Sequence, residues 1–325
     1  HNITYDIQPI IKKLGLEQQI LAITGVELSG MARSPAAATT IGHSNVFPVI
    51  ENSTAFMGGT VPFEGKRLGD VIAAYKDTYP DSFFQLNHPR ANVYDSDLAF
   101  FNHLSIDREF LPRQKLTDKA NQSLLEVLAN KSGYRDIDFD ALELLNGELL
   151  SEYSLVREDW FSLLRQGYFK VATANSDSHS SQQLVALPRN YISQDTDNVA
   201  ELNINQMIAA LKQGNSFGTT GPIINVSFEG VEPGGSFSGN QGVLKVKVDA
   251  APWINVEELR VFINGENTHV FTVGRGEQVE AHLGFTQDSF VTVEVSGNPS
   301  PLYQLVAPGF TPFAFSNPIF IKFND

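Results

Sequence analysis

The pattern of apolar residues changes at residue 222, and this change constrains the fold more than any other feature of the sequence. Before it, short apolar runs alternate with helix-like segments such as 201–213, which stops at the helix terminator Gly214. After it, short β-rich runs follow one another between turn formers, as at 233–235. We therefore expect two domains of different class, residues 1–222 and residues 223–325.

The alternation in the first domain predicts an α/β fold built on a mainly parallel sheet or barrel. The expected helices are 7–14, 67–76, 117–130, 152–165 and 201–213. The expected strands are 20–27, 46–50, 83–87, 141–145 and 169–174. In the second domain the expected strands are 223–228, 243–248, 259–263, 269–273, 290–295 and 318–322. Their succession without a long helical pattern is typical of an antiparallel β-sandwich.

Composition excludes several classes of protein. A hydrophobic fraction of 42% over 325 residues suits a globular chain with a sizeable core, and no apolar run reaches the length of a membrane span. The net charge of −14 argues against a nucleic-acid surface, which needs clustered Lys and Arg. The absence of cysteine excludes disulfides and thiolate metal sites. Any metal must therefore be held by His, Asp, Glu or backbone oxygen.

Good metal ligands follow several of the expected strands. Asp177 and His179 come after the apolar run 169–174, and their spacing of two puts both side chains on one face of an extended chain. Glu27 and His88 also follow apolar runs. The loops after parallel barrel strands converge on one mouth, so these residues would meet there, with His43 as a further candidate.

Each of these residues also has an ordinary interpretation. Asp177 and His179 suit a solvated turn, Glu27 a surface carboxylate, and His43 and His88 loop or turn histidines. Asn146 and Gly147 read most simply as a tight turn. The remaining histidines do not share the strand-end setting, and we leave them out of the site: His103, His269 and His282.

Taken in order, the motifs resemble the polymerase-and-histidinol-phosphatase (PHP) family, in particular its carbaryl-hydrolase-like branch. The motifs are HN at 1–2, GVE at 25–27, GHSN at 42–45, NHP at 87–89, ELLNG at 143–147, NSDSH at 175–179, LPRNYI at 187–192 and TTGP at 219–222. Each motif is short and only the series is specific. The resemblance covers residues 1 to about 222 and implies an irregular (β/α)7 barrel that binds two or three divalent ions.

The resemblance implies six metal ligands: His1, Glu27, His43, His88, Asp177 and His179. Glu27 would bridge two ions, and His43 and His88 would complete the sphere of one of them. The ions would be Zn, Mn or Fe, which nitrogen and oxygen ligands suit. A metal-activated water would hydrolyse a small-molecule phosphoester or another ester.

The chain departs from the family pattern at its start. The family opens with a strand that carries a His-x-His pair, and that segment would precede His1. We therefore expect a fragment that lacks the first barrel strand and binds at most one or two ions, with little activity of its own. In the complete family site, Asp177 would serve the second ion, and His1 and His179 the third. Localisation stays open, export included.

Arg189 is the candidate catalytic residue, because a guanidinium grips phosphate or carboxylate in a bidentate manner. A structural salt bridge is an equally open role for it. Two other functions stay open for the chain as a whole. One is a non-catalytic binding protein, with a degenerate barrel and a sandwich that binds a glycan or a protein. The other is oxidative copper chemistry at a processed His1.

Overall fold

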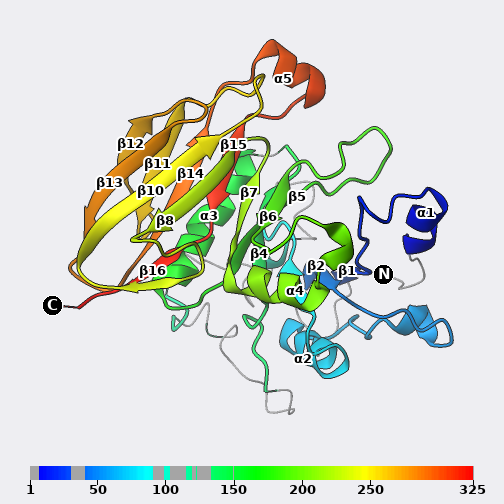
Figure 1. Ribbon diagram of the computed structural model, residues 1–325. Coiled ribbons are helices and arrows are strands. Elements are labelled where there is room, and N and C mark those ends of the chain that lie inside the picture. Colours follow the sequence, from blue (N-terminus) through cyan, green and yellow to red (C-terminus); the bar gives the residue numbers. More distant parts are fainter. Residues whose placement is uncertain are drawn as a thin grey trace. The chain divides into compact units, whose positions relative to one another are not determined.

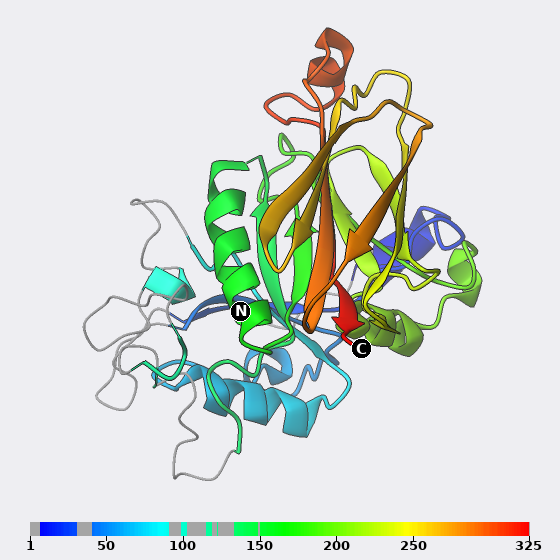
Figure 2. The same ribbon diagram turned by 90° about the vertical axis from the view of Figure 1, so that its left-hand side faces the viewer.

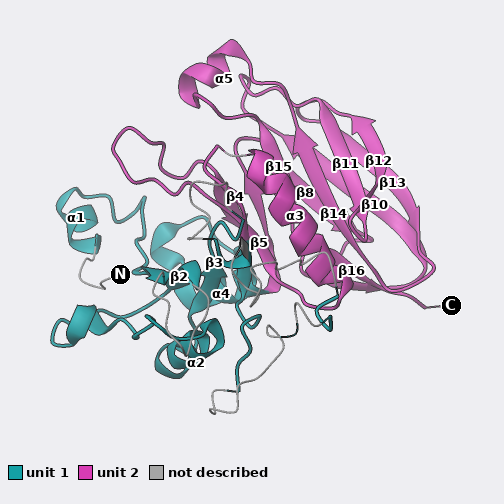
Figure 3. Cartoon of the chain, turned by 180° about the vertical axis from the view of Figure 1, so that it is seen from behind, with its two compact units in different colours: residues 1–142, 194–212 teal, residues 143–193, 213–325 magenta. Residues whose placement is uncertain are grey.

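The computed structural model shows a mixed α/β chain with more strands than helices (Figure 1). It describes residues 7–30, 41–90, 99–102, 115–118, 122, 133–148 and 150–324. The chain divides into two compact units, residues 1–142 with 194–212 and residues 143–193 with 213–325 (Figure 3). The boundary expected near residue 222 stays a prediction. No helix of the described residues has both the length and the hydropathy that a membrane crossing requires.

The first unit combines a small sheet with helices. Its elements are α1 (Gln8–Lys13), β1 (Val26–Gly30), β2 (Gly42–Phe47), the 3₁₀ helix η1 (Phe56–Gly59), α2 (Leu68–Thr78), β3 (Phe83–Leu86), the 3₁₀ helices η3 (Phe100–Asn102) and η5 (Val199–Glu201), and α4 (Ile204–Gln213). The start of β4 (Ala141–Asn146) also belongs to it. The expected helices 7–14, 67–76 and 201–213 are confirmed, whereas most of 117–130 lies outside the described residues.

Strand direction in the first unit differs from expectation. β1 runs antiparallel to β2, and β2 runs antiparallel to β3. β3 pairs in parallel with β4. The prediction of a mainly parallel sheet is therefore wrong for β1 and β2. The segment 31–41 between them is shorter than the connection of about a dozen residues or more that a parallel crossover needs.

The first strand is also shorter than expected. Residues 20–25 are partly or fully exposed, and β1 begins only at Val26, where it can pair with Val46 of β2. Within β1, the side chains of Val26 and Leu28 are buried, and Glu27 between them is half-buried. This alternation is that of a strand with one core face and one wetter face.

The second unit contains most of the strands. Its elements are the end of β4, α3 (Leu150–Arg165), β5 (Val171–Asn175), β6 (Arg189–Ile192), β7 (Ser216–Thr219), β8 (Ile223–Phe228), β9 (Ser236–Ser238), β10 (Gln241–Asp249), β11 (Glu258–Ile263), β12 (Glu266–Thr272), β13 (Gln278–Gly284), β14 (Ser289–Ser296), α5 (Pro301–Val306), β15 (Phe313–Ser316) and β16 (Ile319–Lys322). All the strands expected after residue 222 are present. β6, β7, β9, β13 and β15 were not among the strands expected from the sequence.

Two sheets of the second unit share one apolar core. The first has the order β13-β10-β8, and the second contains β12-β11-β14-β15-β7-β6 with β16 and β9 attached. Val246 of β10, Val261 of β11 and Val293 of β14 belong to the same buried cluster. Among the described residues no sheet closes on itself. The closed barrel and the sandwich therefore stay predictions.

Strand β14 is buried on both faces. Val291, Val293 and Val295 point into the shared core, and the residues between them face the other way. Helix α3 covers that second face, as Figure 2 shows, and the rings of Phe161 and Phe290 lie 5.9 Å apart. A strand in this setting has no wet side, so a charge on it needs a partner.

That charge is Glu294, only 5% exposed. Its Oε1 accepts hydrogen bonds from the Tyr153 hydroxyl at 2.7 Å and from Arg157 Nη1 at 3.0 Å. The Arg157 guanidinium also lies 5.1 Å from the centroid of the Phe262 ring. Burial, and next the charge of Glu294, raise the pKa of Tyr153 well above its ordinary value. This network of hydrogen bonds stabilises the packing of α3 against β14.

We predict that Glu294→Gln lowers the free energy of unfolding by about 3 kcal/mol, because Arg157 loses its buried counter-charge. Urea denaturation measured by circular dichroism would test this. Glu258→Gln is the matched control, since Glu258 pairs with Arg260 at the surface, and its loss is expected to cost under about 1 kcal/mol. Equal losses in the two variants would contradict a buried role for Glu294.

We also predict that stability falls as the pH rises above about 10. The folded chain holds the Tyr153 proton more tightly than the unfolded chain does. Its contribution is therefore complete below the unfolded pKa and is lost as the pH rises, by about 1.4 kcal/mol per pH unit. Denaturation at pH values from about 9 to about 11 should show a shallower decline for Tyr153→Phe. The exposed Tyr134→Phe should follow the wild type.

Candidate metal centre

The pairing of β1 with β2 brings a carboxylate and an imidazole together. In this antiparallel register Glu27 lies opposite Asn45, and His43 lies opposite Ser29. Glu27 and His43 are therefore diagonal neighbours on one face, a separation that long side chains bridge. His43 Nδ1 lies 3.3 Å from Glu27 Oε1. Both residues occupy the second position of their strands, so Glu27 does not end its strand as predicted, and His43 lies within β2 rather than in a loop.

His88 joins them from the end of β3. The pairing of β2 with β3 continues one residue beyond β3, where the Asn87 amide donates to the His43 carbonyl at 3.0 Å. His88 then turns with a φ of +26°, a value that non-glycine residues seldom adopt. Its Nε2 lies 3.1 Å from His43 Nδ1. Backbone strain of this kind persists where the surroundings impose it, and it clusters at functional sites.

Glu27, His43 and His88 form the metal triad. One ligand atom from each lies within 4.8 Å of the other two, and all three residues are half-buried. Four ligands placed about 2.1 Å from a zinc-like ion would lie about 3.4 Å from one another. The distances of 3.1 Å and 3.3 Å from His43 Nδ1 are close to that spacing. The donor set and its geometry therefore fit a divalent ion.

Two amide side chains hold the carboxylate of the metal triad. Asn87 Nδ2 donates to Glu27 Oε1 at 3.3 Å, and Gln85 Nε2 donates to Asn87 Oδ1 at 2.9 Å. Gln85 and Asn87 are 2% and 4% exposed, so this row of hydrogen-bonded side chains lies in the interior of the unit. Second partners of this kind orient the groups that ligate metals.

The pKa of Glu27 is lowered from its ordinary value. The largest cause is the hydrogen bond from His43, and burial opposes it. The Asn87 bond and the two imidazoles lower the pKa further. Glu27 is therefore held in the ionised form, which a cation requires.

Sequence reasoning missed Gln85 and Asn87 as parts of this site. A signal was present, because both are polar residues in the apolar stretch 83–87, and their spacing of two puts them on one face. Buried amides need partners, so such a pair predicts a hydrogen-bonded chain rather than a turn.

Asp177 and His179 lie beside each other in the second unit, but β5 ends at Asn175, so they are not on one face of an extended strand as expected. His179 Nδ1 lies 2.7 Å from the Asp177 carbonyl oxygen and 3.6 Å from its Oδ1. Asp177 has a φ of +46°, and His179 is 68% exposed. Their assignment as metal ligands stays a prediction. His1, the sixth expected ligand, lies outside the described residues, as does His103.

Glu143 is a buried carboxylate of the second unit that was not among the expected metal ligands. It is 2% exposed and accepts hydrogen bonds from Asn175 Nδ2 at 2.8 Å and from Asn146 Nδ2 at 3.1 Å. Asn146 Nδ2 also donates to Asp177 Oδ2 at 3.2 Å. Gly147 does form the expected turn, with a φ of +51°. Asn146 therefore does more than turn the chain, because its side chain links two carboxylates.

Arg189 begins β6 in the second unit. Its Nη1 donates to the Ala186 carbonyl at 3.3 Å, and its guanidinium lies 5.4 Å from the Tyr191 ring centroid. Its role toward a substrate stays a prediction. His269 and His282 lie on β12 and β13, outside the metal triad.

No protein-family model matches this chain, and no curated protein matches it. Among solved structures, the chain is similar to a two-domain protein from Bacteroides vulgatus ATCC 8482, described as containing a predicted PHP-like metal-dependent phosphoesterase. The two are 14% identical, the match covers 94% of this chain and 76% of that chain, and the TM-score is 0.41. A likeness at this level assigns neither fold nor activity to the present chain.

We predict that Asn87→Ala weakens divalent-metal binding about 10- to 100-fold, because Glu27 loses the donor that orients it. Competition with a chromogenic chelator would measure the dissociation constant. Asn45→Ala is the control, since Asn45 lies on the same sheet opposite Glu27. An unchanged affinity in Asn87→Ala would mean that the Gln85–Asn87 chain is structural only.

Proposed function

We propose that this chain is a divalent-metal-dependent hydrolase of the PHP type, with the metal triad holding one ion. The observation that carries the proposal is the meeting of Glu27, His43 and His88, which come from three strands or strand ends. Two imidazoles and one carboxylate within hydrogen-bonding distance form an unusual group for a merely solvated face. The proposed substrate is a small-molecule phosphoester or another ester.

The donor set favours a borderline or moderately hard cation. Imidazole nitrogen and carboxylate oxygen suit Zn, Mn or Fe. Such an ion lowers the pKa of a water molecule that it binds, and it polarises a phosphoryl or acyl oxygen. Catalysis beyond these effects of the ion depends on how the protein positions its own side chains.

The chain keeps one side of the metal triad open. The side chains of His43 and Glu27 are 17% and 32% exposed, so solvent and a small ester can reach them. The buried Gln85 and Asn87 side chains hold Glu27 in one orientation through the hydrogen bond from Asn87. Catalytic metal sites share this division between fixed protein ligands and an open position.

The motif series supports the finer parts of the proposal. These parts are an irregular PHP-type barrel of the carbaryl-hydrolase-like branch, followed by a β-sandwich. In that arrangement Asp177 would serve a second ion, and His1 and His179 a third. Arg189 would grip an anionic group of the substrate through its planar guanidinium.

Metal analysis tests the proposal. The purified full chain, incubated with Zn, Mn or Fe and then dialysed, should retain at least one ion, and Glu27→Ala and His88→Ala should each lose it. His282→Ala is the control, because His282 is an exposed histidine on β13 of the second unit. Ion retention by both triad variants, or loss in the control as well, would contradict a site at the metal triad.

Hydrolysis is the second part of the same test. With the retained ion, release of p-nitrophenol from bis(p-nitrophenyl) phosphate or p-nitrophenyl acetate should exceed background, and Glu27→Ala should abolish the excess. We expect this excess to be small, and hydrolysis of neither ester by the ion-loaded chain would contradict the hydrolase and favour a binding protein.

A further inference from the structure

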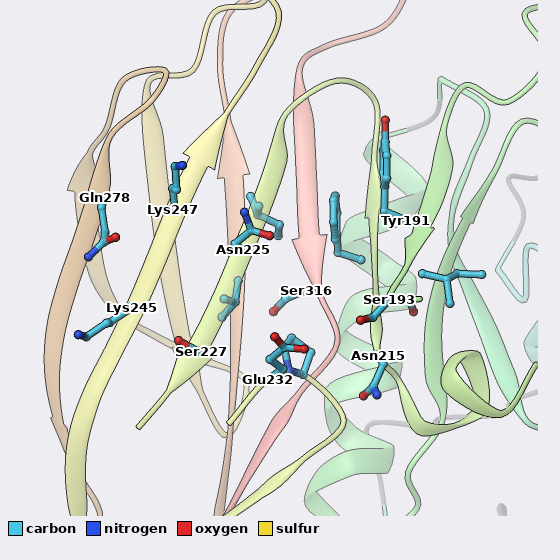
Figure 4. Close-up of a pocket in the computed structure, with 16 residues that line it drawn as sticks. Tyr191, Ser193, Asn215, Asn225, Ser227, Glu232, Lys245, Lys247, Gln278 and Ser316 are labelled. Atoms are coloured by element: carbon cyan, nitrogen blue, oxygen red, sulfur yellow. The ribbon is translucent and has the colours of Figure 1, made fainter. Parts of the chain in front are cut away.

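A cleft of about 460 Å³ lies wholly within the second unit, apart from the metal triad (Figure 4). One wall is formed by β8 and β10 of the three-stranded sheet. The other is formed by β6 and β7, which end the order of the larger sheet. Its volume is in the range of small-molecule sites, which is about 300 to 1,000 Å³.

The first wall is a polar grid set by strand register. Lys247 lies opposite Asn225, and Lys245 lies opposite Ser227, so these four side chains share the outer face of the β8–β10 pair. The residues between them, such as Val226, point into the core. Gln278 of β13 extends the grid, since it lies opposite Lys247 on the far side of β10. Figure 4 shows these polar side chains along one side of the cleft.

The second wall carries an aromatic pair. Tyr191 of β6 lies opposite Phe217 of β7, and their rings stack at 5.1 Å with an interplanar angle of 10°. Stacking on Tyr191 fixes the orientation of Phe217, which lines the cleft. Ser193 and Asn215 stand on the same side, as Figure 4 shows. Phe217 also packs against the shared apolar core, so the aromatic surface that the pair presents in the cleft is a part of each ring, beside hydroxyl and amide groups.

Charges around the cleft nearly cancel. Among the lining side chains, Lys245 and Lys247 can offer hydrogen-bond donors to a ligand, and Glu232 can offer acceptors. Lys245 lies 3.6 Å from Glu280, a pair that is half-exposed. The lining thus offers both donors and acceptors without a strong excess of one sign. This chemistry suits neither an apolar ligand nor a phosphate-rich one.

We propose that this cleft binds a neutral saccharide. Each sugar hydroxyl both donates and accepts, and Asn225, Gln278 and Ser227 provide groups of both kinds. The apolar face of a sugar ring matches the ring of Phe217. The proposal does not depend on the metal triad, which lies in the other unit.

An extended peptide is the competing occupant. β8 ends the order of its sheet, and a peptide strand that added to it would bond mainly to backbone groups. Such a peptide would not require the amide and hydroxyl grid of the outer face or the aromatic wall. The lining side chains therefore favour the saccharide.

Saturation-transfer NMR on the full chain tests the proposal. The probes are neutral β-1,4-linked hexasaccharides of glucose, xylose and mannose, an oligogalacturonate, and a mixture of hexapeptides. We expect at least one neutral hexasaccharide to bind, and calorimetry should show binding about tenfold or more weaker in Asn225→Ala/Lys247→Ala. Glu258→Ala/Thr272→Ala is the matched control, a cross-strand pair outside the cleft.

Every other pattern overturns the proposal. Binding that survives in Asn225→Ala/Lys247→Ala places the ligand elsewhere. Binding of the oligogalacturonate alone means an anion site, and binding of hexapeptides alone means strand addition. No binding of any probe at millimolar concentration means that the cleft is only a solvated surface. Thermal melting of both double variants separates a loss of binding from a loss of fold.

Discussion

The antiparallel register of β1, β2 and β3 is the constraint on which the candidate metal centre depends. Side chains alternate along a strand, so a slip of one residue would turn Glu27 into the core and Leu28 out of it. Leu28 and Val46 are 0% exposed, and each such side chain stabilises the fold by about 1.5 to 3 kcal/mol through burial. The apolar face therefore selects the register, and the register places Glu27 and His43 side by side.

Two features of the first unit close to the metal triad are energetically unfavourable. His88 has a positive φ, and Gln85 is a polar side chain in a strand that is buried throughout. Neither feature helps packing, and an alanine or leucine in place of Gln85 would need no partner. Both features are explained if His88 and Glu27 must be held in one geometry, because the strained turn aims one ring and the amide chain aims one carboxylate.

How far the sequence predicts this structure differs from feature to feature. The existence of strands such as β3 and β14 follows from local apolar runs. Whether neighbouring strands pair in parallel or antiparallel does not, because side chains alternate with a period of two in both kinds of pairing. Glu27, His43 and His88 stood out as polar residues at the ends of apolar runs. Gln85 was visible as a polar residue inside an apolar run, but its link to Glu27 through Asn87 was not, and neither was the role of Glu143, because Glu27 and Asn175 are distant in sequence from the groups they join.

A hydrogen-bonded triad without metal would leave His43 Nδ1 with conflicting demands. A neutral imidazole carries one N–H, so Nδ1 either donates one hydrogen or accepts one. It lies 3.3 Å from an oxygen that only accepts, and 3.1 Å from the Nε2 of His88. A single hydrogen on Nδ1 would be divided between these neighbours. A cation among the three atoms removes the conflict, since each then offers a lone pair to the same centre. The crowding at His43 Nδ1 is thus a physical reason to expect that metal binding stabilises the first unit, because a ligand that binds only the folded state shifts the folding equilibrium.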